Sequence, residues 1–254
     1  MSAAEARLEF LAPGAIEARL VARSVVYLPL GTIEWHCLHL PVGLDALTAH
    51  GLCHRAAMQD GGIVHPALFY GTGGGHASYP WTMMMETERE IAAQLHKTLA
   101  RLDDFGVRLA VLFSGHFADG QLAMIDSIAR DWNGQGRALN VIATSVNRIQ
   151  GRAIAPDHAG LFETTLLGGL WPDLVRLDRL PPTESSPPTA LGEPDDRHDP
   201  KHPLWGIIGA DPRSYDSREG PPFVASSVDW LIGQVRRELG ASGTHEKERA
   251  KNRH

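Results

Sequence analysis

Short apolar runs alternate along this chain with longer stretches in which apolar residues recur every three or four positions. The short runs predict buried strands, and the longer spacing predicts amphipathic helices. The predicted strands are 25–30, 63–70, 107–113 and 138–146. The predicted helices are 46–58, 87–104, 120–132, one after residue 157 that contains Leu166, Leu167 and Leu170, and 226–239. This alternation predicts an α/β fold, with a parallel or mixed sheet covered by helices on both faces.

Three segments depart from the alternation. Residues 181–203 are rich in Pro, Ser and Asp without periodicity, which predicts a long loop that is either functional or disordered. Residues 241–254 are charged and interrupted by Gly and Ser, so we expect one domain over 1–240 followed by a disordered tail. The glycine-rich loop 71–75 lacks the Lys-Ser/Thr of a phosphate-binding loop, which excludes that function.

Composition narrows the class of protein. The chain has 254 residues, 43% of them hydrophobic, and a net charge of −6, which suits one α/β domain and disfavours a nucleic-acid or membrane-surface partner. No apolar run approaches the roughly 20 residues that cross a bilayer, and the N-terminus lacks a signal-peptide pattern. Two cysteines, Cys37 and Cys53, are too few for a disulfide scaffold. We therefore expect a soluble cytoplasmic protein.

Candidate chemistry begins directly after the first predicted strand. Glu34 and His36 are two positions apart, so in extended backbone their side chains leave on the same face. Asp45 follows a short loop later, where it is also a candidate helix cap. Two carboxylates and an imidazole at the carboxyl end of a strand are suitable ligands for a divalent cation. Cys37, beside His36, is a candidate soft ligand or a small buried hydrophobe.

Further candidate ligands follow at the same end of the predicted sheet. His116 comes just after another predicted strand, and Glu163 lies near a helix start. A single Glu or His in such a loop is most often solvated, but five together point to a metal site. The five candidate ligands are Glu34, His36, Asp45, His116 and Glu163.

The motifs that contain these residues resemble those of the creatininase (creatinine amidohydrolase) family over about residues 20–235. The family's first motif, E-x-H-G-x-H-L-P-x-x-T-D, is matched by Glu34, His36, His39, Leu40, Pro41 and Asp45. The second, N-G-H-G-G-N, is matched by Gly115 and His116. The third, H-A-G-x-x-E-T, is matched by His158, Ala159, Gly160, Glu163 and Thr164. A weaker fourth motif, H-x-x-F-P-x-T, is matched by His76, Pro80 and Thr82.

The resemblance implies a three-layer α/β/α domain with a mostly parallel central sheet and two divalent metal ions, Zn²⁺ or alternatively Mn²⁺ or Fe²⁺. Asp45 would bridge the ions, with Glu34 and His116 on one and His36 and Glu163 on the other. A hydroxide shared by the two ions would then attack an amide carbonyl. Some family members have a Glu ligand where this chain has Ala118, so Glu163 must contribute more to the second ion.

The resemblance also suggests roles beyond the ligands. His158 is the candidate proton donor to the leaving nitrogen, with Glu163 as the second catalytic residue, because an imidazole pKa near 6.5 suits proton transfer at neutral pH. The alternative for His158 is a structural histidine bonded to backbone. We expect His39 to orient the ligands, and His76 to be either an active-site wall or a loop-packing residue. Family relatives assemble as hexamers, so the resemblance predicts a homo-oligomer.

Departures from the family motifs make creatinine an unlikely match for this site. Residues 152–155, Arg-Ala-Ile-Ala, lack the gating tryptophan of creatininase proper. The other departures are Cys37, Leu38, Leu44, Ser114, Asp119 and Leu161. Trp35, Trp81 and Trp205 are candidates for a substrate pocket or for core packing.

The predicted function is therefore hydrolysis of a non-peptide C–N bond in a small cyclic amide or a formamide. The alternatives are peptide processing in the maturation of a peptide-derived cofactor and an inactive metal-binding scaffold. A walled cavity would favour the small amide, and an open groove would favour the peptide.

Overall fold

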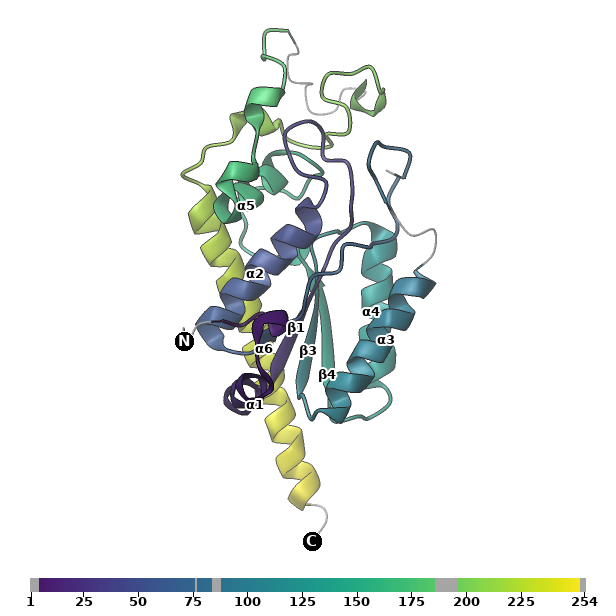
Figure 1. The fold of residues 1–254 in the computed structure, drawn as a ribbon, viewed down its shortest axis with the longest axis vertical. Coiled ribbons are helices and arrows are strands. Elements are labelled where there is room, and N and C mark those ends of the chain that lie inside the picture. Colours follow the sequence, from purple (N-terminus) through teal and green to yellow (C-terminus); the bar gives the residue numbers. More distant parts are fainter. Residues whose placement is uncertain (1–4, 76, 84–87, 186–195, 252–254) are drawn as a thin grey trace.

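The computed structural model of this protein describes residues 5–75, 77–83, 88–185 and 196–251. Its centre is a parallel four-stranded sheet in the order β2-β1-β3-β4 (Figure 1). The strands are β1 (Val25–Leu30), β2 (Ile63–Val64), β3 (Leu109–Ser114) and β4 (Asn140–Ser145). All three pairings are parallel, as the alternation of strands and helices predicts.

Helices cover both faces of the sheet, which confirms the predicted three-layer α/β/α architecture. One layer contains α2 (Leu44–Asp60), α5 (Leu161–Leu170) and α6 (Gly220–Lys251). The other contains α3 (Arg89–Asp104) and α4 (Asp119–Asn133). The short α1 (Pro13–Ala22) packs its Ile16 and Leu20 against the core on the α3/α4 side.

The two cores are formed by alternate residues of the same strands. Tyr27 and Phe113 are fully buried against α2, α5 and α6, whereas Leu28 and Leu112 are buried against α3 and α4. Successive side chains of a strand leave on opposite faces, so a strand covered on both faces must be apolar throughout. This explains why β1 and β3 appear in the sequence as continuous apolar runs.

The strand order locates the natural position for a ligand site. The chain leaves β1 toward β2 on one side of the sheet and reaches β3 on the other side. In open parallel sheets the crevice at such a switch point, at the carboxyl ends of the strands, is where ligands bind. In this fold it lies where β1 ends at Leu30 and β3 ends at Ser114.

Several elements differ in extent from the sequence prediction. The second strand keeps only Ile63–Val64 of the predicted 63–70, with a further isolated bridge at Leu68, since Pro66 cannot donate to the ladder. It lies at an edge of the sheet, where a nearby proline is tolerated. Helix α3 begins at Arg89, two residues after the predicted start, and Thr87 lies outside the described residues.

The C-terminal helix is the largest difference. Helix α6 runs to Lys251, beyond the end at residue 239 that the sequence pattern predicts. The division into one domain and a tail stays a prediction. The reason is local: Gly240 and Gly243 are followed by Glu, Lys, Arg and Ala, which are strong helix formers.

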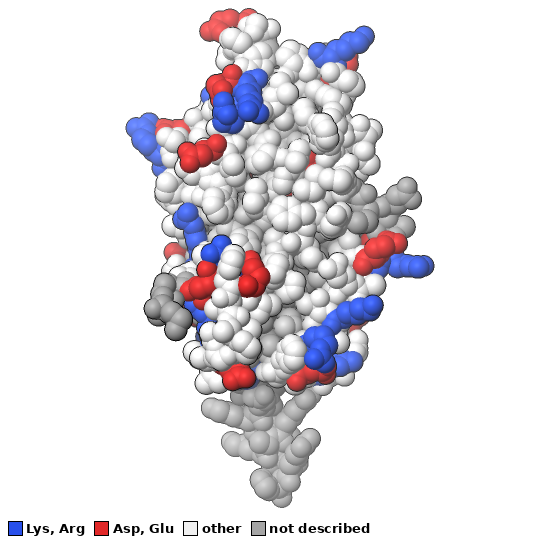
Figure 2. Space-filling view, in the orientation of Figure 1, with Lys and Arg blue, Asp and Glu red and all other residues white. Residues whose placement is uncertain are grey.

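The length of the helices and the distribution of surface charge are relevant to membrane and nucleic-acid partners. None of the described helices combines the length and the apolar character needed to cross a membrane. On the face drawn in Figure 2, basic and acidic side chains are interspersed, without an extended area of one sign. That face therefore lacks the broad basic area typical of proteins that bind nucleic acid.

Two glycines let the start of α2 approach the strand ends. A Cβ on Gly31 would overlap the backbone of Ala46, and a Cβ on Gly115 would overlap the backbone of Asp45. Gly31 follows β1 and Gly115 follows β3, so α2 lies directly against both strand ends. This close approach places Asp45 at the switch point.

We predict that Gly115→Ala lowers the free energy of unfolding by about 3 kcal/mol, because the new methyl group forces α2 away from β3. Chemical denaturation measures this change. Gly14→Ala is the control, since a Cβ there meets nothing within 4 Å and we expect a change below about 1 kcal/mol. Equal stability of Gly115→Ala and the natural chain would contradict the proposed packing constraint.

Candidate metal centre and catalytic cavity

The structure brings all five predicted ligands together at the switch point of the sheet. Glu34 and His36 follow β1, Asp45 is the second residue of α2, His116 follows β3, and Glu163 is in the first turn of α5. Each of the five residues is at most 5% exposed. Burial of three carboxylates in one place is unfavourable unless positive charge compensates them.

The five residues form two groups that share one carboxylate. In the first, His116 Nδ1 lies 3.1 Å from Glu34 Oε2 and 3.3 Å from Asp45 Oδ2. In the second, His36 Nε2 lies 3.3 Å from Asp45 Oδ1 and 3.5 Å from Glu163 Oε2. In each group the candidate ligand atoms lie within 4.8 Å of one another. The two oxygens of Asp45 therefore face different groups, as expected for a bridging carboxylate.

These spacings suit metal coordination. Two ligand atoms that are each 2.1 Å from an ion at a tetrahedral angle lie about 3.4 Å apart. The inter-residue distances of 3.1–3.5 Å in both groups are close to this value. In addition, His36 Nε2 and both carboxylate oxygens of Asp45 are buried without a hydrogen-bond partner among the described residues. Unsatisfied buried polar atoms are rare, and an ion is one of their ordinary explanations.

The electrostatics of the cluster favour positive charge. Burial lowers the pKa of His36, but the carboxylates of Asp45 and Glu163 outweigh it and raise that pKa to about 10. Burial acts on the Asp45 carboxyl in the opposite sense, yet the imidazoles of His36 and His116 keep its pKa below the usual value. Burial raises the pKa of Glu163 well above its usual range. A site that attracts protons in this way also attracts a cation, which would displace them.

Backbone groups hold two of the ligands in place. His36 Nδ1 lies 2.9 Å from the Glu34 carbonyl, which can only accept, so Nδ1 carries the proton and Nε2 faces the cluster. Glu163 Oε2 accepts from the Ala159 N–H at 2.6 Å. Ala159 has a φ of 53°, in the left-handed region, and is fully buried. The loop before α5 therefore aims the Glu163 carboxylate.

Asp157 is a functional residue that the sequence analysis missed. It is buried and accepts from the backbone N–H groups of Gly160, Phe162 and Glu163, at 2.9–3.3 Å. Burial raises its pKa to about 6 despite these bonds. It ties down the helix end that carries Glu163, and the Asp just before a predicted helix was the available clue.

A second missed residue, Gln121, connects His116 to the glycine-rich loop. Its Oε1 accepts from the Thr72 N–H at 3.1 Å, and its Nε2 donates to Ser114 Oγ at 3.4 Å. Ser114 Oγ in turn donates to the His116 carbonyl at 2.5 Å. Gln121 is fully buried, so this chain joins three segments on one side of the site. Nothing in the sequence pattern distinguishes it from an ordinary surface glutamine.

His158 lies beside the cluster and has features expected both of a proton donor and of a structural histidine bonded to the backbone. Its Nε2 is 2.9 Å from the Trp35 carbonyl, so Nε2 donates and the neutral ring has its lone pair on Nδ1. Nδ1 lies 4.0 Å from Glu34 Oε1, and the ring centroid is 4.6 Å from that of His36. Its donor atoms also form a group with those of Glu34 and His36. The ring can therefore exchange a proton in the cavity, or act as a ligand.

The remaining candidates divide into supporting residues and residues away from the cavity. His39 Nε2 lies 3.1 Å from Thr164 Oγ1, and burial lowers its pKa to about 3, so it is a neutral supporting residue. Cys37 is 4% exposed in the apolar core, and burial raises the pKa of its thiol to about 11. It belongs to neither ligand group. The side chain of Asp45 makes no capping hydrogen bond at the start of α2, so Asp45 is not the helix cap that the sequence suggested.

The structure describes the three candidate tryptophans but not His76. Trp35 donates to the Trp205 carbonyl at 3.0 Å and packs against its ring, while Trp81 is 78% exposed. None of the three is among the described residues that line the cavity. His76 lies outside the described residues.

A cavity of about 610 Å³ lies beside the cluster. Besides four of the ligands and His158, it is lined by Gly74, Phe117, Ala118, Asp119, Gly120 and Ile208. Its volume is within the range of roughly 300–1,000 Å³ that is typical of sites for drug-sized ligands. The cavity thus has room for more than a small cyclic amide.

Comparison with known sequences connects this site to characterised hydrolases. Residues 11–235 match the family described as creatinine amidohydrolase. The chain is 29% identical over 187 residues to creatinine amidohydrolase of Pseudomonas putida, covering 65% of this chain and 71% of that protein. It is 27% identical over 226 residues to the mycofactocin precursor peptide peptidase of Mycobacterium ulcerans strain Agy99, covering 84% of each chain.

A solved structure shows the same fold. The structure described as "Creatininase Mn" superposes with a TM-score of 0.73 at 25% identity, covering 92% of this chain and 98% of that one. The family match includes the segments that carry the five candidate ligands.

We predict that the purified, tag-free protein binds about two equivalents of divalent metal per chain and that Asp45→Ala loses both, because Asp45 is shared by the two groups. Elemental mass spectrometry measures the content. Asp131→Asn, on the exposed side of α4, is the control and should retain the metal. Full metal content in Asp45→Ala would show that the cluster is not the binding site.

Proposed function

Because the chain belongs to the creatininase family, we propose that it is a metal-dependent amidohydrolase that cleaves a non-peptide C–N bond in a small cyclic amide or a formamide. The observation that carries this proposal is the buried set of three carboxylates and two imidazoles, in two groups joined by Asp45. An inactive scaffold is disfavoured, because a protein that has lost catalysis is expected to lose its metal ligands first, and this chain retains all five candidates.

The donor set fits two divalent ions. Glu34 and His116 would hold one, His36 and Glu163 the other, and Asp45 both. Mixed nitrogen and oxygen ligation suits Zn²⁺, Mn²⁺ or Fe²⁺, and we assign Zn²⁺ first, with the manganese form named in the similar structure as the main alternative. When bound, the ions would polarise the scissile carbonyl and lower the pKa of a water molecule toward 7.

The chain's own residues would handle the proton and the substrate's position. With Nε2 fixed on the Trp35 carbonyl, His158 presents Nδ1 toward the cluster, where it can take up a proton and deliver it to the leaving nitrogen. Glu163 is held by the Ala159 N–H at the cavity wall and is, after His158, the second residue available for proton transfer. Ile208 and Phe117 supply apolar walls.

Peptide processing is the second candidate function, and two observations favour it. A relative that matches over 84% of both chains is named a peptide peptidase. The cavity of about 610 Å³ is also larger than a small cyclic amide requires.

Creatinine itself is disfavoured, because residues 152–155 lack the tryptophan expected from the resemblance. We further propose a homo-oligomer, a hexamer by resemblance, located in the cytoplasm.

We predict that His158→Ala keeps its metal but lowers kcat by about 10²-fold or more, in line with the loss of a general acid. Metal content and steady-state kinetics are measured on the same sample. His96→Ala, a histidine on α3 away from the cavity, is the control. Loss of metal in His158→Ala would instead assign this residue as a ligand, grouped with Glu34 and His36.

We expect the metal-loaded protein to hydrolyse at least one member of a panel of cyclic ureides, lactams and N-formyl compounds, and to lose that activity in a chelator. Product release is followed by mass spectrometry. Creatinine should react at least about 10²-fold more slowly than the best member. Cleavage of short peptides with no turnover of the small amides would replace the leading function by the second candidate.

A further inference from the structure

Asp119 is a carboxylate of the catalytic cavity that belongs to neither ligand group. It is the first residue of α4, three positions after His116, and its side chain is exposed. The described residues provide it with no ion pair. The described cavity lining also contains no Lys or Arg. Because none of the described residues forms an ion pair with Asp119, its charge at the cavity wall is available to a substrate.

The charge balance of the cavity depends on this residue. The argument rests on the proposed function, in which two divalent ions bring four positive charges to three carboxylates, those of Glu34, Asp45 and Glu163. With neutral imidazoles and a neutral water ligand the loaded cluster would keep one positive charge, and with that water ionised to hydroxide it would be neutral. Asp119 adds one negative charge to the cavity wall, outside both ligand groups. An anionic substrate would therefore meet repulsion at this wall.

We propose that Asp119 selects cyclic amides that carry a cationic group, such as an ammonium, near the scissile carbonyl, and disfavours those that carry a carboxylate. The distance between Asp119 and the candidate ligand His116 limits how far the cationic group can lie from the scissile carbonyl. Residues three apart have Cα atoms at most about 11 Å from each other, so His116 and Asp119 span an acyl chain of a few carbon atoms. The favoured substrate class is thus a small cyclic amide with an ammonium group a few carbon atoms from the scissile carbonyl.

A purely structural role for Asp119 has a different signature. An acidic residue in the first turn stabilises a helix through its dipole, and Asp119 occupies that position in α4. Such a role would change stability and would affect all substrates alike. A substrate-recognition role instead changes affinity according to the charge of the ligand.

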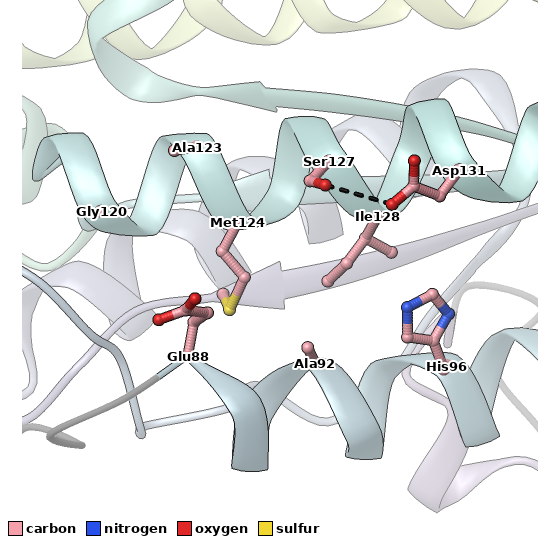
Figure 3. A pocket seen from close by; sticks show the side chains of 9 residues that line it. All are labelled: Glu88, Ala92, His96, Gly120, Ala123, Met124, Ser127, Ile128 and Asp131. Carbon is pink, nitrogen blue, oxygen red and sulfur yellow. Dashed lines mark hydrogen bonds between the residues drawn. The ribbon is translucent and has the colours of Figure 1, made fainter.

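A second cavity provides a matched control on the same helix. It has a volume of about 400 Å³ and lies between α3 and α4, with Glu88 and His96 on one wall and Asp131 on the other (Figure 3). Ser127 Oγ donates to Asp131 at 3.2 Å. Of the residues that line this cavity, only Gly120 also lines the catalytic one. Asp131→Asn thus removes the same charge from α4 outside the catalytic cavity.

The decisive experiment measures binding of three hydroxamates to the metal-loaded protein by calorimetry, without turnover. The probes are 4-aminobutanohydroxamic acid, pentanohydroxamic acid and succinic monohydroxamic acid, which share a metal-binding head and differ in the charge of the tail. We expect the ammonium probe to bind about five-fold more tightly than the neutral one and the carboxylate probe to bind most weakly. Asp119→Asn should remove this order, whereas Asp119→Glu and Asp131→Asn should retain it.

The outcomes separate this inference from the proposed function. The preference should weaken as ionic strength rises, because screening acts on an exposed pair. If the natural chain binds the three probes equally well, or if Asp119→Asn keeps the order, the assignment of Asp119 is overturned while the metal site stands. If no hydroxamate binds to any variant, the proposed metal-dependent function fails, and the substrate class inferred from it fails as well.

Discussion

The buried carboxylate of Asp45 is the group on which the rest of the site depends. Its two oxygens face two different sets of ligand atoms and have no hydrogen-bond partner among the described residues. An ionised carboxylate in this environment is unfavourable unless positive charge lies beside it. The close packing of α2 on Gly31 and Gly115 keeps it there. Fold and candidate chemistry are therefore linked at one residue, because the glycines that admit the helix also bring the carboxylate to the cluster.

The ligands around Asp45 are held by backbone groups more than by other side chains. The Glu34 carbonyl sets the orientation of His36, the Ala159 N–H holds Glu163, and the Trp35 carbonyl orients His158. Backbone bonds of this kind depend on the path of the chain and not on the identity of its neighbours. This explains how the site keeps its geometry although the first motif departs from the family pattern, for example at Cys37, which has a φ of 56°.

The fold and much of the candidate site could be predicted from the sequence. Apolar runs without alternation predicted the buried strands β1 and β3, and their positions placed Glu34 and His116 at one end of the sheet. The errors occurred where local pattern is weak. Pro66 shortens β2, and the helix propensity of residues 244–251 extends α6 beyond the glycines that suggested its end. Element boundaries depend on packing and on single hydrogen bonds, which composition does not reveal.

The sequence by itself determined the class of the fold, the five candidate ligands and the family motifs, because these depend on residue type and spacing along the chain. The tertiary structure alone decided how the ligands divide into two groups, that Asp157 and Gln121 support them, and that the tryptophans lie outside the described cavity lining. These facts concern residues distant in sequence that meet only when the strands align. The same distinction applies to Asp119. Its negative charge follows from the sequence, but its position in the cavity lining depends on the folded chain.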